Sequence, residues 1–336
     1  MVLVGLSAPV KIASAAGAGI LAGVNFAGAE ANSDRPQARP GFDYVYPSEA
    51  EIAWAASHGM TALRLPVEWS RLQPALEAPL DTAEMGRVLA VVRVAHAHGI
   101  RVVLDLHDYG SWRSLEVGST ALPDRVFADS WRRIAIVARG QPGMVLGLMN
   151  EPHTMPAARW EASAQAALNA IWATGARNLV LIPGAGWDGA HSWTEGGSGS
   201  NAAAMDRLLV PQDGHVAFEF HQYFDRDYSG TKPDCLAPAE AVRTLEGATA
   251  WLAASRRQGF LGEFGTAGTT ECLATLDAVL SFLDAHRAEW IGWTYWAAGS
   301  WWGNYMFSIE PQNGKEKPQM AVLARHLKST GKQAHR

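Results

Sequence analysis

Two glutamates stand at the ends of short apolar runs and could act as a pair. Glu151 ends the run "VLGLMNEP" (145–152), and Glu263 lies near the end of "FLGEFG" (260–265). A carboxylic acid and a carboxylate that face each other can divide proton transfer and nucleophilic attack between them. A single glutamate after a buried strand is often only a solvated strand end. The pair therefore matters only if the fold brings both to one place.

Other polar residues occupy equivalent positions on further apolar runs. They are Arg64, His107, Asn150, His221 and Tyr223. Taken alone, a histidine in such a place is more often structural than catalytic, and an arginine is usually an ion-pair partner. Their shared position at run ends is what indicates a site.

Eight runs of this kind recur along the chain and are expected to be strands. They cover residues 20–28, 61–67, 101–108, 144–152, 179–187, 216–225, 260–265 and 290–299. The segments between them carry apolar residues at helical spacing, as in 84–99 and 158–175. Several of these segments end in a glycine, which accepts the left-handed conformation at a helix end; the set is Gly59, Gly99, Gly175 and Gly259.

Strands that alternate with helices predict a parallel sheet, and eight of them predict a (β/α)8 barrel in a single domain over residues 20–336. A doubly wound open sheet is the alternative, but no Gly-rich phosphate turn follows the first run. In a barrel, all the polar residues above would meet at one mouth, because parallel strands place their C-terminal ends together. The long insertions 29–48, 188–201 and 225–238 follow strand ends on the same face.

Composition narrows the function classes. The 336 residues are 48% apolar and 18% charged, with a net charge of −5, which disfavours disorder and nucleic-acid binding. The absence of an apolar run of about 18 residues argues against a membrane span. Residues 1–19 are interpreted as an N-terminal arm or the remnant of an export signal. No cofactor motif is present, so we expect no cofactor and no metal.

Tryptophan is abundant, with 14 copies. Half of them follow strand-like runs among Gly, Ser and Pro; they are Trp69, Trp112, Trp187, Trp193, Trp296, Trp301 and Trp302. The apolar face of a pyranose ring stacks on an indole. Two converging carboxylates with such a surface favour glycoside hydrolysis, which needs one acid for the leaving oxygen and one carboxylate for the anomeric carbon.

The ordered motifs resemble glycoside hydrolase family 5, the cellulase family A. They are "LRLP" at Arg64, "LDLHDYG" at His107, "LMNEP" at Asn150 and Glu151, "FHQYFD" at His221 and Tyr223, "LGEFG" at Glu263, and "WTYWAAGSWWG" at Trp296. The stretches "GVNFAGAE", "GWDGAHSW" and "YMFSIEP" further resemble the subfamily of bacterial and fungal endo-β-1,4-glucanases.

The resemblance implies retaining hydrolysis of β-1,4-glucosidic bonds. Glu263 would attack the anomeric carbon, and Glu151 would first protonate the leaving oxygen and then deprotonate water, with the carboxyl groups roughly 5 to 5.5 Å apart. Arg64 and Tyr223 would orient Glu263, and Asn150 would bond the sugar 2-hydroxyl.

His107 and His221 would orient substrate and carboxylates, and Trp296 would form the floor beneath the sugar at the cleavage point. Flanking subsites are assigned to Trp187, Trp193, Trp301 and Trp302.

The resemblance also implies a disulfide between Cys235 and Cys272, which would join two loops near the site and suit a secreted or periplasmic protein. Two residues depart from the family pattern. Asp108 stands where Asn is usual, and Ala31 stands where Phe is usual.

Several alternatives stay open. The substrate could be another β-glycan such as mannan, xyloglucan or lichenan, or the enzyme could release cellodextrins from chain ends. A non-catalytic carbohydrate-binding barrel would give no reason for both glutamates. A metal-dependent hydrolase would need a His-x-His on the first strand, which reads "GVNFAGAE". We expect a monomer whose partner is a β-glucan or cello-oligosaccharide.

Overall fold

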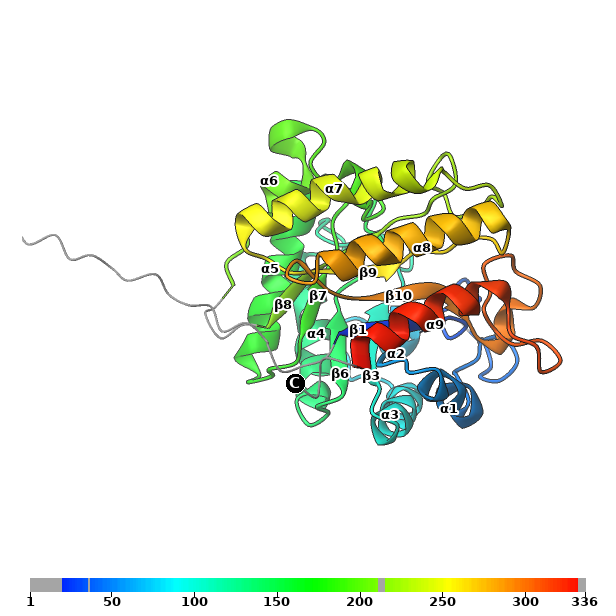
Figure 1. Ribbon diagram of the computed structural model, residues 1–336. Helices are drawn as coiled ribbons and strands as arrows, with labels where there is room; N and C mark the ends of the chain where they lie inside the picture. The colour runs from blue at the N-terminus through cyan, green and yellow to red at the C-terminus, as the bar shows by residue number, and fades with distance from the viewer. Residues whose placement is uncertain (1–19, 36, 211–214, 332–336) are drawn as a thin grey trace, which may run out of the picture.

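The computed structural model describes residues 20–35, 37–210 and 215–331 (Figure 1). Eight parallel strands of this part form a closed barrel in the order β1, β10, β9, β8, β7, β6, β3, β2. Their bounds are β1 Leu21–Phe26, β2 Ala62–Val67, β3 Arg101–Leu106, β6 Met144–Gly147, β7 Val180–Ile182, β8 Val216–His221, β9 Gly259–Glu263 and β10 Trp290–Ala298. The predicted (β/α)8 barrel is confirmed, and an open sheet is excluded by the pairing of β1 with β10.

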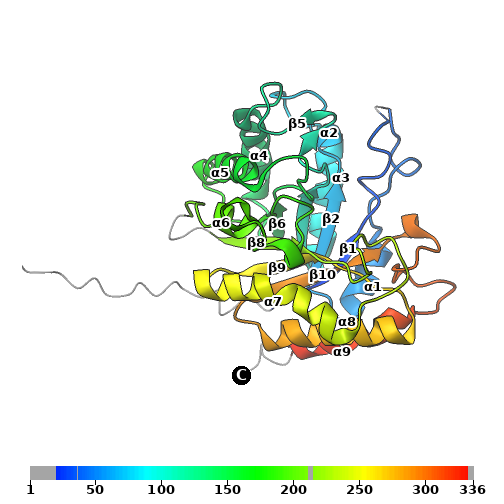
Figure 2. The ribbon, with the colours of Figure 1, turned by 90° about the horizontal axis from the view of Figure 1, so that it is seen from above.

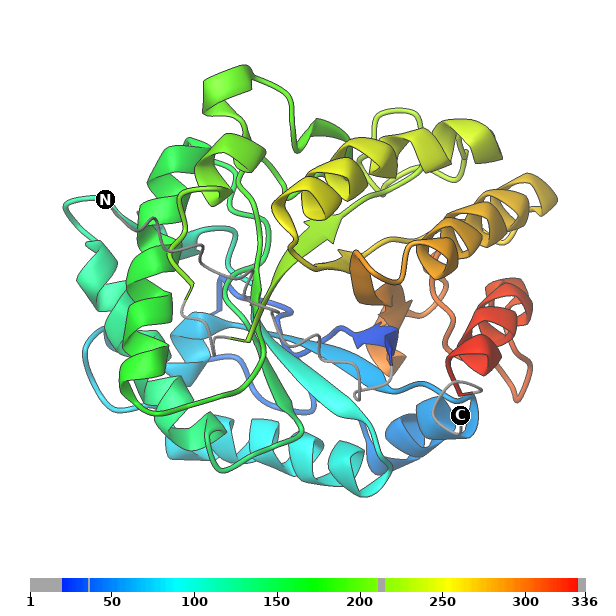
Figure 3. The same ribbon diagram turned by 60° about the vertical axis from the view of Figure 1, so that its left-hand side comes forward.

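Helices form an outer layer around these strands (Figure 3). The α-helices are α1 Glu49–Ser57, α2 Trp69–Leu72, α3 Thr82–Ala97, α4 Asp124–Ala138, α5 Ala157–Ala173, α6 Asn201–Met205, α7 Pro238–Ser255, α8 Thr270–Ala285 and α9 Pro318–Gly331. Among them, α8 packs between α7 and α9 (Figures 1 and 2). The remaining elements are a short hairpin, β4 Ser111–Trp112 with β5 Leu115–Glu116, and the 3-10 turns Ala190–Ser192, Gly197–Gly199 and Ser300–Trp302.

The inside of the barrel is built in layers. One apolar side chain from each of seven strands forms a buried cluster; the residues are Leu21, Ala62, Val103, Val145, Leu181, Ala217 and Phe260. Because side chains alternate across a strand, the residue two positions further on faces the same interior. That position is Arg64 on β2, Asp105 on β3 and Glu219 on β8, so a polar layer lies above the apolar one, toward the C-terminal ends of the strands.

The glycines at the helix ends follow the expectation with one exception. Gly59, Gly99 and Gly175 have φ angles of 82°, 74° and 80°. Gly259 instead begins β9. Helix α7 ends at Ser255, and its C-cap residue Arg256 takes the left-handed conformation with φ 55°. The predicted helix end at Gly259 was therefore wrong. Glycine suits that position for packing, since a Cβ there would lie 2.6 Å from Leu252 Cδ1.

Cys235 and Cys272 form a disulfide, as expected. It ties the loop after β8 to the first turn of α8. Among the described helices, none combines the length and hydropathy that a membrane span requires. The predicted N-terminal arm, residues 1–19, lies outside the described residues.

Candidate active site

A buried arginine organises the mouth of the barrel. Arg64 has no solvent exposure, and its Nε donates to Glu219 Oε1 at 2.8 Å. Its Nη1 donates to Glu263 Oε1 at 2.7 Å and to Asn25 Oδ1 at 3.0 Å. Its Nη2 donates to Asn150 Oδ1 at 2.8 Å. A planar guanidinium can hold several acceptors in fixed directions, so one side chain sets the positions of residues from four other strands or strand ends.

Glu263 is held by two donors from opposite sides. Arg64 bonds Oε1, and the Tyr223 hydroxyl donates to Oε2 at 3.0 Å. Burial and the charge of Glu263 raise the pKa of Tyr223 well above its ordinary value, so the phenol keeps its proton. Together the two donors fix the rotation of the Glu263 carboxylate.

Glu151 approaches Glu263 from the other side of the mouth. It follows β6 in a left-handed conformation with φ 40°, which is uncommon for a residue with a side chain and turns the chain at this point. Its Oε1 bonds His221 Nδ1 at 2.7 Å. One carboxylate oxygen of Glu151 and one of Glu263 lie within 4.8 Å of each other.

The two histidines rest on buried carboxylates that the sequence interpretation missed. His107 Nδ1 bonds Asp105 Oδ2 at 2.9 Å, and His221 Nε2 lies 3.4 Å from Glu219 Oε1. In the sequence, Asp105 and Glu219 lie inside apolar runs, where side chains are expected to belong to the core. The available signal was their spacing, two residues before each predicted histidine on the same face of the strand.

These carboxylates control the protonation of the imidazoles. Burial lowers the pKa of His221, but the charge of Glu263 and the bonds to Glu151 and Glu219 raise it well above its ordinary value. Burial likewise lowers the pKa of His107, and Asp105 reverses the direction, so that the net shift is upward. Both shifts favour the protonated, cationic form of the imidazole ring.

Aromatic rings line the mouth on two sides. Trp296 stacks on His107 with ring centroids 5.7 Å apart. Across the barrel, Trp187 is 54% exposed and stacks on His153 with centroids 3.6 Å apart. Tyr109 contacts both rings of that stack edge-on. Neither His153 nor Tyr109 was identified from the sequence, although each lies two residues beyond a predicted site residue.

The remaining predicted tryptophans fall in different environments. Trp301 is 40% exposed beside the loop after β1, and Trp302 packs edge-on against Trp296. Trp193 is 0% exposed and packs against Phe220 and Trp251. The prediction that Trp193 flanks a subsite was wrong, because the 3-10 turn at Ala190–Ser192 folds this part of the insertion back onto the core.

The geometry of the mouth also raises the question of a bound cation. One possible ligand atom from each of Glu151, His221 and Glu263 lies within 4.8 Å of the others, which is close enough to share an ion. Their ligand atoms already have donors, however. Arg64 and Tyr223 occupy the two oxygens of Glu263, and His221 bonds Glu151. The arrangement fits a paired-carboxylate site better than a metal centre.

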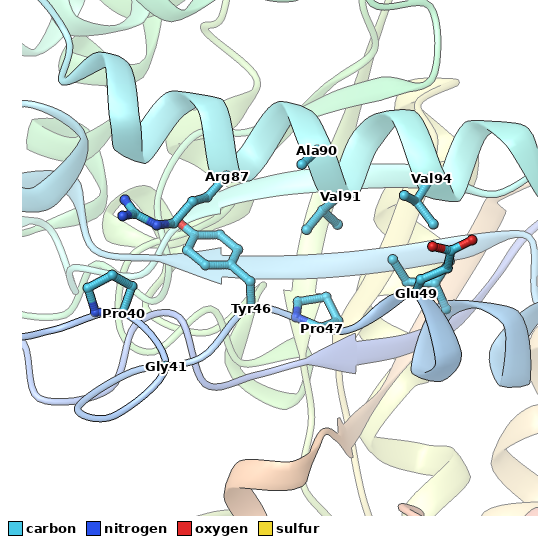
Figure 4. A pocket seen from close by; sticks show the side chains of 10 residues that line it. Pro40, Gly41, Tyr46, Pro47, Glu49, Arg87, Ala90, Val91 and Val94 are labelled. Atoms are coloured by element: carbon cyan, nitrogen blue, oxygen red, sulfur yellow. The ribbon is translucent and has the colours of Figure 1, made fainter.

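A separate hollow of about 340 Å³ lies between α1, α3 and the loop after β1 (Figure 4). Its walls are mostly apolar, with Glu49 and Arg87 along its edge; they comprise Pro40, Gly41, Tyr46, Pro47, Glu49, Ile52, Arg87, Ala90, Val91 and Val94. None of the residues of the paired-glutamate site lines it.

A (β/α)8 barrel with two facing glutamates and exposed indoles at its mouth is typical of glycoside hydrolases. The comparison with protein families makes the class specific. Residues 21–299 match the model described as "Cellulase (glycosyl hydrolase family 5)", and the chain belongs to this family.

Relatives and solved structures agree with this assignment. The chain is 32% identical to "Endoglucanase gh5-1" of Neurospora crassa over 294 residues, which cover 87% of this chain and 73% of that protein. It is 40% identical to XacCel5A, solved in complex with cellopentaose, with a TM-score of 0.89 and coverage of 91% and 99% of the two chains. The Pseudomonas stutzeri endoglucanase Cel5A, solved with cellobiose, is 31% identical with a TM-score of 0.84 and coverage of 91% and 92%.

Proposed function

We propose that this chain is an endo-β-1,4-glucanase that cleaves by a retaining, two-glutamate mechanism. The observation that carries the proposal is the approach of Glu151 and Glu263, with carboxylate oxygens within 4.8 Å. Retaining glycosidases hold their carboxyl groups about 5 to 5.5 Å apart, whereas inverting enzymes leave about 6.5 to 9.5 Å for a water molecule. The separation at this mouth favours direct attack by one carboxylate.

Glu263 is the nucleophile in this proposal. The bonds from Arg64 and Tyr223 hold its carboxylate in place and aim its free lone pairs at the anomeric carbon. Attack forms a covalent glycosyl-enzyme as the bond to the leaving oxygen breaks. The same donors then stabilise the carboxylate that returns when water releases the sugar.

Glu151 acts first as acid and then as base. It gives a proton to the leaving oxygen while Glu263 attacks. Once Glu263 is esterified, its negative charge is gone, and with it the largest influence that raises the pKa of His221. The imidazole beside Glu151 then carries less positive charge, and Glu151 takes a proton from the water that releases the sugar.

Asn150 and Trp296 hold the sugar at the cleavage point. Asn150 Oδ1 accepts from Arg64, so its NH₂ group is the one that can donate to the 2-hydroxyl. Such a bond strengthens as the oxocarbenium-like transition state forms. Trp296 provides a floor, and His107, stacked on it, presents its Nε2 toward the mouth beside Tyr109.

A glucan substrate is supported by the relatives, which are described as endoglucanases, and by the two oligosaccharide complexes. The exposed indoles suit a chain that crosses the mouth. Trp187 follows β7, and Trp301 follows β10 beside β1, which lies opposite β7 in the ring of strands. Sugar units on both sides of the cleavage point would allow cutting within a chain.

The roles of the two glutamates are distinguished by replacing each of them. Glu263→Gln is expected to nearly abolish hydrolysis of cello-oligosaccharides and to keep their binding. Glu151→Ala is expected to lose roughly 10² to 10⁴-fold in kcat on the same substrates.

The Glu151→Ala variant should retain activity on 2,4-dinitrophenyl β-cellobioside in azide, because a good leaving group needs no acid and azide needs no base. The product should be the β-glycosyl azide, identified by NMR. Near-normal turnover of Glu263→Gln, or an α-glycosyl azide from Glu151→Ala, would contradict the assignment.

Substrate and mode of cutting are tested together. On carboxymethylcellulose, an endo-acting enzyme lowers viscosity steeply for each reducing end released, whereas release from chain ends lowers it slowly. Mannan, xyloglucan and lichenan, measured in parallel, should be cleaved less efficiently. A preference for one of these glycans would change the substrate and leave the mechanism intact.

We also propose that the protein is an exported monomer. The Cys235 to Cys272 disulfide supports an oxidising compartment, where such bonds persist.

A further inference from the structure

A third carboxyl group, that of Glu30, reaches the mouth from the loop after β1. Its Oε2 accepts the Gly28 backbone N–H at 2.6 Å. Arg71 fixes the loop on both sides of it, since its guanidinium donates to the carbonyls of Ala29 at 2.6 Å and Ala31 at 2.5 Å. The position of the carboxylate is therefore set by the backbone rather than by a mobile side chain.

The turn that presents Glu30 requires glycine. Gly28 has a φ of 147°, and a Cβ there would lie 2.9 Å from Val45 Cγ2 and 3.3 Å from Trp301 Cβ. The loops after β1 and β10 thus pack directly against each other, and both project at the same end of the barrel in Figures 1 and 2. Glu30 belongs to the wall that also carries the exposed Trp301.

The electrostatic neighbours of Glu30 are groups of the active site. Burial raises its pKa, the nearby His107 lowers it, and the charge of Glu263 raises it further, with a net upward shift. Among the described residues its donors are the backbone N–H groups of Gly28 and Glu30, and no lysine or arginine forms a salt bridge with it. The side chain remains partly exposed.

Among the described residues, no lysine or arginine pairs with this carboxylate, and its hydrogen bond to the Gly28 N–H leaves acceptor sites for a further donor. Sugar hydroxyl groups are donors of the right kind. The side of the cleavage point follows from the ring of strands. Glu151 follows β6, next to β7, so the leaving part of the chain extends toward β6 and β7. The part that stays on Glu263 extends toward β10 and β1, where Glu30 lies.

We propose that Glu30 is a specificity residue that accepts a hydrogen bond from a hydroxyl group of the substrate on the non-reducing side of the cleavage point. This inference rests on the proposed function. A site built to bond a hydroxyl rejects analogues that lack it far more strongly than an apolar pocket does. Glu30 would accordingly favour glycans that place a hydroxyl at this point of the wall.

The test compares wild type and Glu30→Gln on 2,4-dinitrophenyl β-cellobioside and its monodeoxy analogues. The aryl leaving group makes the sugar occupy only the non-reducing side. Gln can still accept the Gly28 N–H, so the loop is retained while the charge is lost. A hydrogen bond to a charged group supports a fall in kcat/KM of roughly tenfold or more. One deoxy analogue should be poor for wild type and no worse than its parent for the variant.

Glu310→Gln is the matched control. Glu310 follows β10, accepts the Gly299 N–H at 3.0 Å and has a pKa raised by burial, as Glu30 does. Its charged neighbours are Glu51 and Glu316 rather than catalytic groups. This variant should keep the wild-type kcat/KM and the wild-type response to every deoxy analogue.

Three outcomes would overturn the inference. The first is an unchanged kcat/KM for Glu30→Gln, and the second is an equal loss of kcat/KM in Glu310→Gln. The third uses a further variant, Glu30→Ala: a loss of kcat/KM in this variant alone, together with a lowered Tm, would mean that Glu30 has only a structural role. Failure of wild type to cleave the cellobioside at all would instead contradict the proposed function.

Discussion

At the scale of single residues, Asp108 is a buried acid beside a second acid. It is 9% exposed and Glu68 is 4% exposed. Burial raises the pKa of Asp108 well above its ordinary value, and the charge of Glu68 raises it further, while the Trp69 N–H at 2.8 Å lowers it. The folded protein therefore holds a proton on Asp108 at pH values where the unfolded chain has lost it.

This pair makes a prediction about stability and pH. Above the ordinary pKa of 3.8, the folded state binds more protons at Asp108 than the unfolded state, so stability falls as pH rises toward the folded pKa. Asp108→Asn removes that loss, because an amide can still accept from Trp69 and can donate to Glu68. The variant should gain about 2 °C or more in Tm at pH 7 and little at pH 4, measured by calorimetry.

Asp129→Asn is a control of opposite sign. Burial raises the pKa of Asp129, but bonds from Arg133 and Arg132 reverse the direction, and the net shift is downward. Removing that carboxylate should give no gain at pH 7. A Tm of Asp108→Asn equal to wild type at both pH values would show that Asp108 is ionised in the folded protein.

At the scale of elements, the loop after β8 carries both Tyr223 and the disulfide. Cys235 in this loop is bonded to Cys272 in the first turn of α8, with a sequence separation of 37. Closing a loop of 37 residues lowers the conformational entropy of the unfolded chain. In the chain-entropy model this stabilises the folded state by about 4 kcal/mol. The bond thus stabilises the wall of the mouth that positions the Tyr223 hydroxyl.

Replacing both cysteines by serine is expected to lower the free energy of unfolding by about 2 to 4 kcal/mol. The kcat at 25 °C should change little, because the bond of Tyr223 to Glu263 does not depend on the sulfur atoms. Urea unfolding measures the first quantity and hydrolysis of a cellobioside the second. As a control, wild type is reduced and its thiols are blocked, and its stability is compared with that of untreated wild type. An equal loss in the reduced protein would assign the effect to the disulfide. An unchanged stability of the double serine variant would contradict the prediction.

The elements also show what the sequence could predict. Strand positions and the residues at their ends follow from apolar runs, so the sequence predicts that Glu151, Glu263 and Arg64 lie at one end of the barrel. Side chains within strands were not, because Asp105 and Glu219 become meaningful only once the inward face of each strand is known. Trp193 was misassigned for a related reason, since a loop that folds back onto the core carries no periodic pattern.

At the scale of the whole molecule, closure of the barrel arranges the eight strands in a ring, so that strands far apart in the sequence can be neighbours or face each other. β1 and β7 are distant in sequence and opposite in the ring. The proposed glucan substrate would therefore cross the mouth from the loops after β1 and β10 to the loop after β7. The direction depends on β10 pairing with β1, and strand counting predicted that closure. The packing of the loop after β1 against the loop after β10 could not be predicted, because it depends on tertiary contact between irregular segments.

The ring also gathers charge at the mouth, and this supports a prediction about metals. Asp105, Glu219, Glu263 and Glu151 could attract a divalent cation, but an arginine or a histidine already holds at least one oxygen of each. Arg64 forms ion pairs with Asp105, Glu219 and Glu263, and His221 bonds Glu151.

We therefore expect kcat/KM to be the same in millimolar EDTA as in buffer. Zn²⁺, which prefers imidazole and carboxylate ligands, should inhibit by competing for His221 and the two glutamates. The measurement is cellobioside hydrolysis after dialysis against EDTA, with Mg²⁺, Mn²⁺ and Zn²⁺ added back separately. Loss of activity in EDTA that any of these cations restores would replace the paired-carboxylate mechanism with a metal-assisted one.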